Sequence, residues 1–279
     1  MLHDLTGPDR ERVRPLFAAL DYHLSMESVI EGTNPGQVWA DDASQPRAAV
    51  VLSTEGAYLA GQAGHEAFNA ALAERFGAWI ASGRGMLAVD LDPPAWEEVL
   101  PRLLVGRPPI RQARRHYTCT GIALDWRRAL PAGYEVRRLD AELLGDAAVS
   151  IPDHARGWIS GNWGSEDAFL RLGFGFGTLH GHDVVSWCIA DCVSGDRCEV
   201  GIHTAEAHRR RGLAACTAAA AVEHALQSGF VSVGWHCDEE NEGSWRTAER
   251  AGFVHDRDYT FRFCFFDEAQ HRAEAARRA

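Results

Sequence analysis

The sequence predicts an α/β (α+β) fold in which a mixed, mostly antiparallel twisted sheet is flanked by helices. Strand-like segments rich in apolar residues alternate with segments of helical spacing along the 279-residue chain. The composition, with 46% hydrophobic and 24% charged residues, is typical of a globular protein. Both halves of the chain show the order strand, strand, strand, helix, strand, helix, strand. This repetition predicts two related α/β halves.

The first half begins with a predicted helix over residues 9–20. Asp9 is expected to cap this helix, and its apolar residues, among them Val13 and Phe17, have the spacing of one helix face. The remaining elements of this half are predicted as strands at 37–42, 47–53, 57–62 and 86–92 and as helices at 65–82 and 95–104.

Prolines 108, 109 and 131 bracket a predicted strand over residues 116–126, which closes the first half or bridges the two halves. The domain boundary is placed there, giving an N-terminal domain over 1–118 and a C-terminal domain over 119–279. The second half is predicted as strands at 134–140, 174–181, 183–192, 197–204, 231–237 and 259–266. Its predicted helices lie at 141–149, 165–173 and 241–252 and within the alanine-rich stretch 208–226.

Charge and hydropathy exclude several classes of function. The net charge of −11 argues against nonspecific nucleic-acid binding, which needs a positive surface. We expect no membrane partner, because no apolar run approaches the length of a membrane span. The charged first residues lack the apolar core of a secretory signal, so a cytoplasmic protein is expected. A monomer or homodimer is expected, with no nucleic-acid partner.

Seven cysteines are present, and none forms a C-x-x-C pair. Cys188, Cys192 and Cys198 are candidate metal ligands together with His203 or His236. The favoured interpretation is that the cysteines are small buried hydrophobic residues on strands. No metal is therefore expected.

Three arginines and a glycine precede the run of alanines in the predicted alanine-rich helix: Arg209, Arg210 and Arg211 are followed by Gly212. Glycine is expected in the first turn or two of this helix. Backbone N–H groups at a helix N-terminus have no partners within the helix and bind phosphate readily. Glycine allows close approach of a phosphate, and arginine adds charge. The alternative is that the arginines are solvated and the glycine only permits close packing.

The segment Arg209–Ala214 resembles the R/Q-x-x-G-x-G/A signature of the GCN5-related N-acetyltransferases (GNAT superfamily). The likeness extends over residues 134–266. The segments around "VSWCIAD", "EVGIHTAEAH" and "WHCDEENEGSWRTAERAGF" resemble the subgroup that includes zwittermicin A resistance proteins. The resemblance implies a GNAT fold and use of acetyl-CoA as co-substrate. The first half has Gly61 and Gly64 but no arginine at the matching place, so a degenerate GNAT-like half without a cofactor site is expected.

The resemblance also implies which residues bind the cofactor. Backbone groups of Ile202, His203 and Thr204 would pair with the pantetheine arm, and Asn241 and Ser244 would contact the cofactor from the following helix. The pyrophosphate would lie on the backbone N–H groups of Arg210, Arg211, Gly212, Leu213 and Ala214, with side-chain charge from Arg209 and Arg211.

The implied activity is transfer of an acetyl group from acetyl-CoA to a primary amine of a small molecule of the antibiotic or aminopolyol type. The alternative is a noncatalytic acyl-CoA-binding or ligand-sensing module. Glu199 is the first candidate for the base, on the strand that precedes the glycine loop. His203 and Asp191 are further candidates, and a solvated ion pair is the alternative for Glu199.

The proton donor for the leaving thiolate is less defined. Ala248 stands where many relatives carry a tyrosine, which leaves Ser244, Tyr259 or water as donors. A nucleophilic Cys237 is an alternative to direct transfer, although no base partner for it is evident in the sequence.

Overall fold

The computed structural model describes residues 2–278, and its packing divides into two compact units. Of the described residues, unit 1 contains 2–113 and 260–278, and unit 2 contains 114–259. Both dividing points lie inside strands, β6 (Ile110–Cys119) and β12 (Val254–Phe265). The domain boundary proposed between residues 118 and 119 therefore differs from the division by packing.

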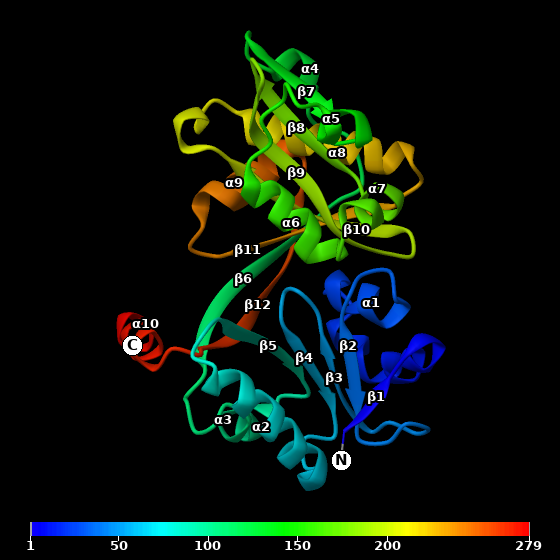
Figure 1. Cartoon of the computed structure of the whole chain (residues 1–279), viewed down its shortest axis with the longest axis vertical. Helices are drawn as coiled ribbons and strands as arrows, with labels where there is room; N and C mark the ends of the chain where they lie inside the picture. Colours follow the sequence, from blue (N-terminus) through cyan, green and yellow to red (C-terminus); the bar gives the residue numbers. More distant parts are fainter. Residues whose placement is uncertain (1, 279) are drawn as a thin grey trace. The chain divides into compact units, whose positions relative to one another are not determined.

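Unit 1 contains a mixed sheet in the order β1-β2-β3-β4-β5-β12, in which β4 and β5 run parallel. Figure 1 shows α2 and α3 beside these strands. Its elements are β1 (His3–Leu5), η1 (Gly7–Leu20), α1 (Leu24–Glu31), β2 (Gln37–Ala40), β3 (Ala48–Leu52), β4 (Ala57–Gly61), α2 (Glu66–Ala81), β5 (Met86–Asp92), α3 (Trp96–Leu103) and α10 (Glu268–Arg278).

Unit 2 contains a sheet in the order β12-β6-β11-β10-β9-β8-β7, in which β10 and β11 are parallel and β7 to β10 are antiparallel. Its elements, drawn in green to orange in Figure 1, are α4 (Trp126–Ala129), β7 (Tyr134–Arg138), α5 (Ala141–Gly145), α6 (Asp153–Trp163), α7 (Glu166–Leu172), β8 (Gly175–His180), β9 (Asp183–Ser194), β10 (Arg197–Thr204), η2 (Glu206–His208), α8 (Leu213–Gln227), β11 (Ser232–Asp238) and α9 (Glu242–Ala251).

The predicted strands and helices occur in the predicted order in both halves. The elements β1, α1, α4, α6, η2 and α10 were not predicted, and the strand expected at 259–266 begins already at Val254. Other local expectations were also wrong. Residues 7–20 form a 3₁₀ helix that starts before Asp9 and contains Pro15, so Asp9 is not its cap. The strand expected at 116–126 runs instead over Ile110–Cys119. Its charged first half is tolerated because Arg114 and Arg115 form ion pairs with Asp238 and Glu239. The helix expected at 141–149 ends at Gly145.

Helices α8 and α6 cover opposite faces of the unit 2 sheet. Successive side chains of a strand point to opposite faces. On β9, the Ser186 hydroxyl lies 3.5 Å from the Thr217 hydroxyl of α8, whereas the Trp187 ring meets His154 of α6. Most of the small side chains of α8 are buried, so this helix packs closely on the sheet.

The parallel pairing of β10 with β11 is short. It runs over Arg197–Glu199 only, although β10 continues to Thr204 and stays paired with β9. A β-bulge lies on β9 opposite the step from Glu199 to Val200. Strands β10 and β11 therefore separate just beyond Glu199, and the edge of β10 that faced β11 becomes available.

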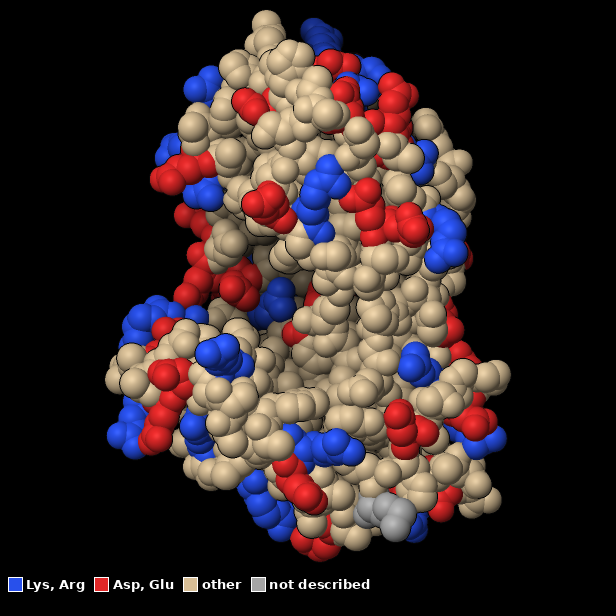
Figure 2. All heavy atoms as spheres, viewed as in Figure 1, with Lys and Arg blue, Asp and Glu red and all other residues tan. Residues whose placement is uncertain are grey.

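Basic and acidic side chains are interspersed on the face seen in Figure 2.

Within the described residues, no helix is both long enough and apolar enough to cross a bilayer.

Candidate functional site

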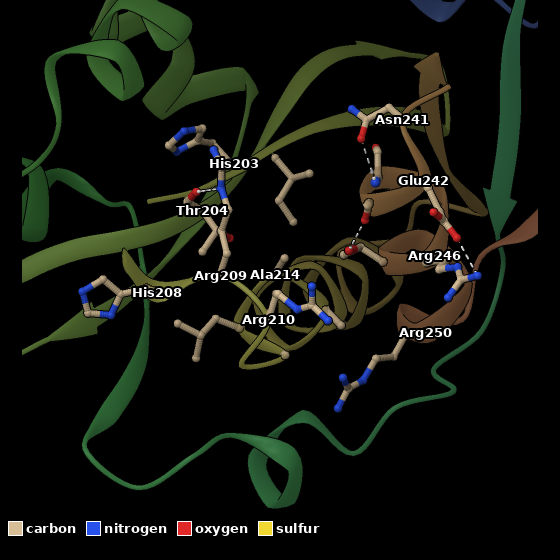
Figure 3. Close-up of a pocket in the computed structure, with 17 residues that line it drawn as sticks. His203, Thr204, His208, Arg209, Arg210, Ala214, Asn241, Glu242, Arg246 and Arg250 are labelled. Carbon is tan, nitrogen blue, oxygen red and sulfur yellow. Dashed lines mark hydrogen bonds and ion pairs between the residues drawn. The ribbon is translucent and has the colours of Figure 1, made fainter. Parts of the chain in front are cut away.

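A cavity of about 840 Å³ opens in unit 2 between the end of β10, the loop before α8, and α9 (Figure 3). It contains nearly all residues that the sequence assigned to cofactor binding. The lining residues are Ile202, His203, Thr204, His208, Arg209, Arg210, Gly212, Leu213, Ala214, Ala215, Asn241, Glu242, Gly243, Ser244, Arg246, Thr247 and Arg250.

The loop before α8 presents an uncapped helix N-terminus to this cavity. Gly212 is the residue just before the helix, with φ of +82°, and no side chain caps α8. The expectation that Gly212 lies inside the first turns was wrong, because the helix begins at Leu213. A left-handed conformation at this point favours glycine and ends the loop. Arg210 is also left-handed, with φ of +62°.

Positive charge gathers around this N-terminus. The Arg209 Nε–H donates to the carbonyl oxygen of Thr204 over 3.1 Å, which ties the loop to the end of β10. The guanidinium of Arg250 lies beside Gly212, about 3.1 Å from where a β-carbon would stand. Arg209, Arg210, Arg246 and Arg250 all line the cavity, whereas Arg211 does not. Backbone N–H groups and cations together suit a phosphate.

Sequence reasoning missed Arg246 and Arg250 of α9. Their spacing of four residues places them on one face of a helix, which was the available signal. Figure 3 shows both side chains on the α9 side of the cavity, where Arg246 forms an exposed ion pair with Glu242.

Asn241 and Ser244 both line the cavity and also stabilise its wall. The Asn241 side chain accepts a hydrogen bond from the backbone N–H of Ser244 over 3.1 Å and so caps α9. The Ser244 hydroxyl accepts one from the indole N–H of the buried Trp235, also at 3.1 Å. These contacts fix the start of α9 against β11.

Glu199 lies where β10 and β11 separate, and it is 3% exposed. Its Oε1 is 3.0 Å from Nε2 of His236, and Nδ1 of the same ring is 2.8 Å from the Tyr259 hydroxyl. The Cys192 thiol donates to Oε2 over 3.4 Å. An ionised carboxylate only accepts, so the His236 Nε2–H donates to Glu199 and Nδ1 accepts from Tyr259. A hydrogen-bonded chain thus joins the buried carboxylate to the half-buried tyrosine.

His203 is paired with another histidine. Its Nδ1 is 3.1 Å from Nε2 of His154, and its ring stacks on Trp187 with centroids 5.8 Å apart. Burial, together with the nearby His154 and Arg209, lowers the pKa of His203. The side chain is therefore neutral at pH 7, and His203 lines the cavity at the end of β10.

Asp191 is on the α6 face of the same sheet. It is 8% exposed, and its carboxylate accepts from the indole N–H of Trp158 over 2.5 Å. Its oxygens cover Gly201, where a β-carbon would come within 2.8 Å of them. Because residues 199 and 201 point to one face of β10, the carboxylates of Asp191 and Glu199 lie on the same face of the sheet.

The cysteines form no disulfide, and all seven are buried. Burial raises the pKa of the Cys188, Cys198 and Cys237 thiols, which disfavours the thiolate. Among the described residues, one group of side chains is close enough together to hold a metal ion, and it contains no cysteine. This group is His116, Glu199 and His236. The sequence did not single out His116.

A model of the GNAT acetyltransferase family matches residues 14–261 of the chain. The uncharacterized N-acetyltransferase YdfB of Bacillus subtilis (strain 168) is 27% identical over 262 residues, which are 93% of this chain and 97% of that protein. The match to a zwittermicin A resistance subgroup stays a prediction.

Solved structures share the fold over nearly the whole chain. The GCN5-related N-acetyltransferase-like protein from Streptococcus suis 89/1591 has a TM-score of 0.68 at 25% identity, covering 91% of this chain and 97% of that one. A tandem GNAT protein from the clavulanic acid biosynthesis pathway has a TM-score of 0.55 at 12% identity, covering 95% and 99%, which is consistent with two GNAT-like halves. The chain therefore belongs to the GNAT acetyltransferase family and is an N-acetyltransferase with the GNAT fold.

Proposed function

We propose that this enzyme transfers an acetyl group from acetyl-CoA to a primary amine of a small molecule by direct attack. The C–N bond forms, the C–S bond of the thioester breaks, and the CoA thiolate takes up a proton. The observation that carries the proposal is the cavity that connects the separated edge of β10 to the arginine-lined N-terminus of α8.

The donor is proposed to lie along this cavity. The pyrophosphate accepts hydrogen bonds from the backbone between Arg210 and Ala214, whose first-turn N–H groups have no intrahelical partners. The pantetheine arm pairs with Ile202–Thr204 like an added strand, because β11 no longer occupies that edge. Arg209 and Arg250 add side-chain charge beside the phosphates. The thioester then reaches the point where the strands separate, close to Glu199.

Glu199 is proposed as the base that removes the amine proton, acting through His236. The 3% exposure of the carboxylate limits direct contact with a substrate, and the imidazole bonded to it provides the path. As His236 gains a proton at Nδ1, the adjacent carboxylate stabilises the imidazolium charge. His203, which is neutral and paired with His154, is the second candidate.

The proton for the CoA thiolate is proposed to come from Tyr259 or Ser244. Tyr259 ends the hydrogen-bonded chain from Glu199, and its O–H donates to His236 in the resting state. Ser244 lines the cavity and already accepts from Trp235, so its own O–H remains a donor.

The acceptor is proposed to be a cationic small molecule, of the antibiotic or aminopolyol type that the zwittermicin resemblance implies. Two buried carboxylates, Asp191 and Glu199, lie on the α6 face of the sheet. Trp158, which is 42% exposed, lies beside Asp191. A carboxylate next to an aromatic ring favours an ammonium group. The net charge of −11 favours the approach of such a cation.

The first half is proposed to bind no CoA. The helix at the matching place, α2, is capped by its own His65, whose Nδ1 accepts from the Phe68 backbone N–H over 3.1 Å. In contrast to α8, its N-terminus is satisfied by a side chain.

Calorimetric titration with acetyl-CoA and a thiol-release assay with a panel of amines test this function. Glu199→Gln is expected to keep the Kd for acetyl-CoA and to lower kcat by about 100-fold, most strongly at low pH. Glu206→Gln, on the exposed η2, is the matched control and keeps both values. Absence of binding at millimolar acetyl-CoA would refute the proposal, and so would tight binding without thiol release on any amine.

A further inference from the structure

Three potential metal ligands converge inside unit 2 from three neighbouring strands. His116 lies on β6 directly opposite His236 of β11, and Glu199 of β10 is opposite Gly234. Residues 234 and 236 share one face of β11, so all three side chains lie on that face. One ligand atom from each lies within 4.8 Å of the other two. The side chains of His236 and Glu199 are 5% and 4% exposed, and that of His116 is 7% exposed.

The outer nitrogen of each imidazole is held by an oxygen atom. Nδ1 of His116 is 2.9 Å from the Asp256 carboxylate, and Nδ1 of His236 is 2.8 Å from the Tyr259 hydroxyl. Each ring therefore turns its Nε2 inward, and the two rings stack with centroids 4.5 Å apart. An oxygen partner on the far nitrogen is what orients histidine ligands in metal sites.

Gly234 leaves room where these atoms meet. A β-carbon at this position would lie 3.4 Å from both His116 Nε2 and Glu199 Oε1, and 2.7 Å from Glu199 Cγ. The two ligand atoms thus border the same spot above the strand, and only glycine keeps that spot open.

We propose that His116, Glu199 and His236 bind a divalent transition metal of the Zn²⁺ type. Two imidazoles and one carboxylate are a donor set that zinc accepts, with water in the fourth position. Zinc bonds of about 2.0–2.2 Å at tetrahedral angles place two ligand atoms about 3.4 Å apart. Because the ligand atoms lie within 4.8 Å of one another, the side chains need to close by at most about 1.4 Å. The proton on His236 Nε2 moves to Nδ1, and the Tyr259 oxygen then accepts instead of donating.

Bound metal inhibits acetyl transfer, since it occupies the carboxylate and the imidazole assigned above to proton removal. This consequence rests on the proposed function, whereas metal binding itself does not. The ion is therefore an inhibitor that chelation removes and not a cofactor of the reaction.

The test begins with chelator-treated enzyme titrated with Zn²⁺ against a chromophoric chelator, with Co²⁺ absorption bands reporting the coordination. One equivalent is expected at submicromolar concentration. Glu199→Gln and His116→Gln are expected to weaken zinc binding by at least about 10-fold. His154→Gln is the matched control, because His154 and His203 also form a close histidine pair but lie outside this cluster. Thermal unfolding shows that each variant is folded.

Absence of zinc binding by the wild-type enzyme at micromolar concentration overturns the site, as does equal affinity in Glu199→Gln and His116→Gln. Acetyl transfer by the chelator-treated enzyme is measured separately and tests the proposed function alone. If zinc binds through these ligands and transfer continues unchanged, the inhibition is refuted while the metal site stands.

Discussion

The substitution Gly212→Ala separates the backbone conformation of this residue from its proposed contact with the cofactor. Gly212 has φ of +82°, in the left-handed region, where a residue with a β-carbon costs about 1–2 kcal/mol. The new methyl group would also meet the Arg250 guanidinium at 3.1–3.3 Å, but this is the mobile end of a long side chain and can shift. The expected loss of unfolding free energy is therefore the backbone cost alone, about 1–2 kcal/mol.

In the Gly212→Ala variant, we expect acetyl-CoA binding to weaken as well, by an amount that the strained backbone does not explain. The methyl group would stand on the surface that a phosphate must approach, and it would displace Arg250. Losing one hydrogen bond to a charged group costs about 1.5–3 kcal/mol. We therefore expect the Kd for acetyl-CoA to rise about 10- to 100-fold.

Gly181→Ala is the matched control for this experiment. Gly181 has φ of +63° in the turn between β8 and β9, and a β-carbon there would meet no atom within 4 Å. Its unfolding free energy should fall by a similar amount, as measured in urea, while calorimetry gives an unchanged Kd. An unchanged Kd for Gly212→Ala, or an equal rise for Gly181→Ala, would refute the role of the loop in cofactor binding.

Three further predictions follow from the site. Arg250→Ala should weaken acetyl-CoA binding about 10-fold and reduce the salt dependence of binding, as measured by titration at two ionic strengths. The control Arg138→Ala, on β7, should change neither the affinity nor its salt dependence. Cys237→Ser should keep kcat within a few-fold, because burial raises the thiol pKa and the proposed acetyl transfer is direct. Loss of activity in this variant, together with a trapped acyl-enzyme in the wild type, would contradict this prediction. The lowered pKa of His203 means that the unfolded state binds its proton first as pH falls below about 6.5. The unfolding free energy should therefore fall from pH 7 towards pH 5, and it should fall less steeply in His203→Gln than in the wild type. Urea titrations at several pH values measure it, and the same decrease with pH in both proteins would exclude the effect.

The local signals in the sequence predicted most of the residues that line one wall of the cavity. The glycine loop, the alanine-rich helix and the strand before them are contiguous, so one segment, 197–228, carries the geometry of the proposed phosphate site in its own hydrogen bonds and backbone angles. The same signals were available but overlooked for α6, where Ala155, Ile159 and Trp163 recur at helical spacing behind Pro152. Gly157 and Gly161 obscured this pattern, because glycine lowers helix propensity.

By itself, the sequence determined the repeated order of strands and helices shared by the two halves, and it predicted the glycine loop as an anion site with Glu199 on the strand beside it. The tertiary structure decided what surrounds that group. His116, Glu199 and His236 are separated by 83 and 37 positions along the chain, and only the register of β6, β11 and β10 brings their side chains to one face. Register depends on packing between segments far apart in sequence, where no local propensity acts. The same pairing buries the carboxylate and joins it by hydrogen bonds to His236 and, through that ring, to Tyr259.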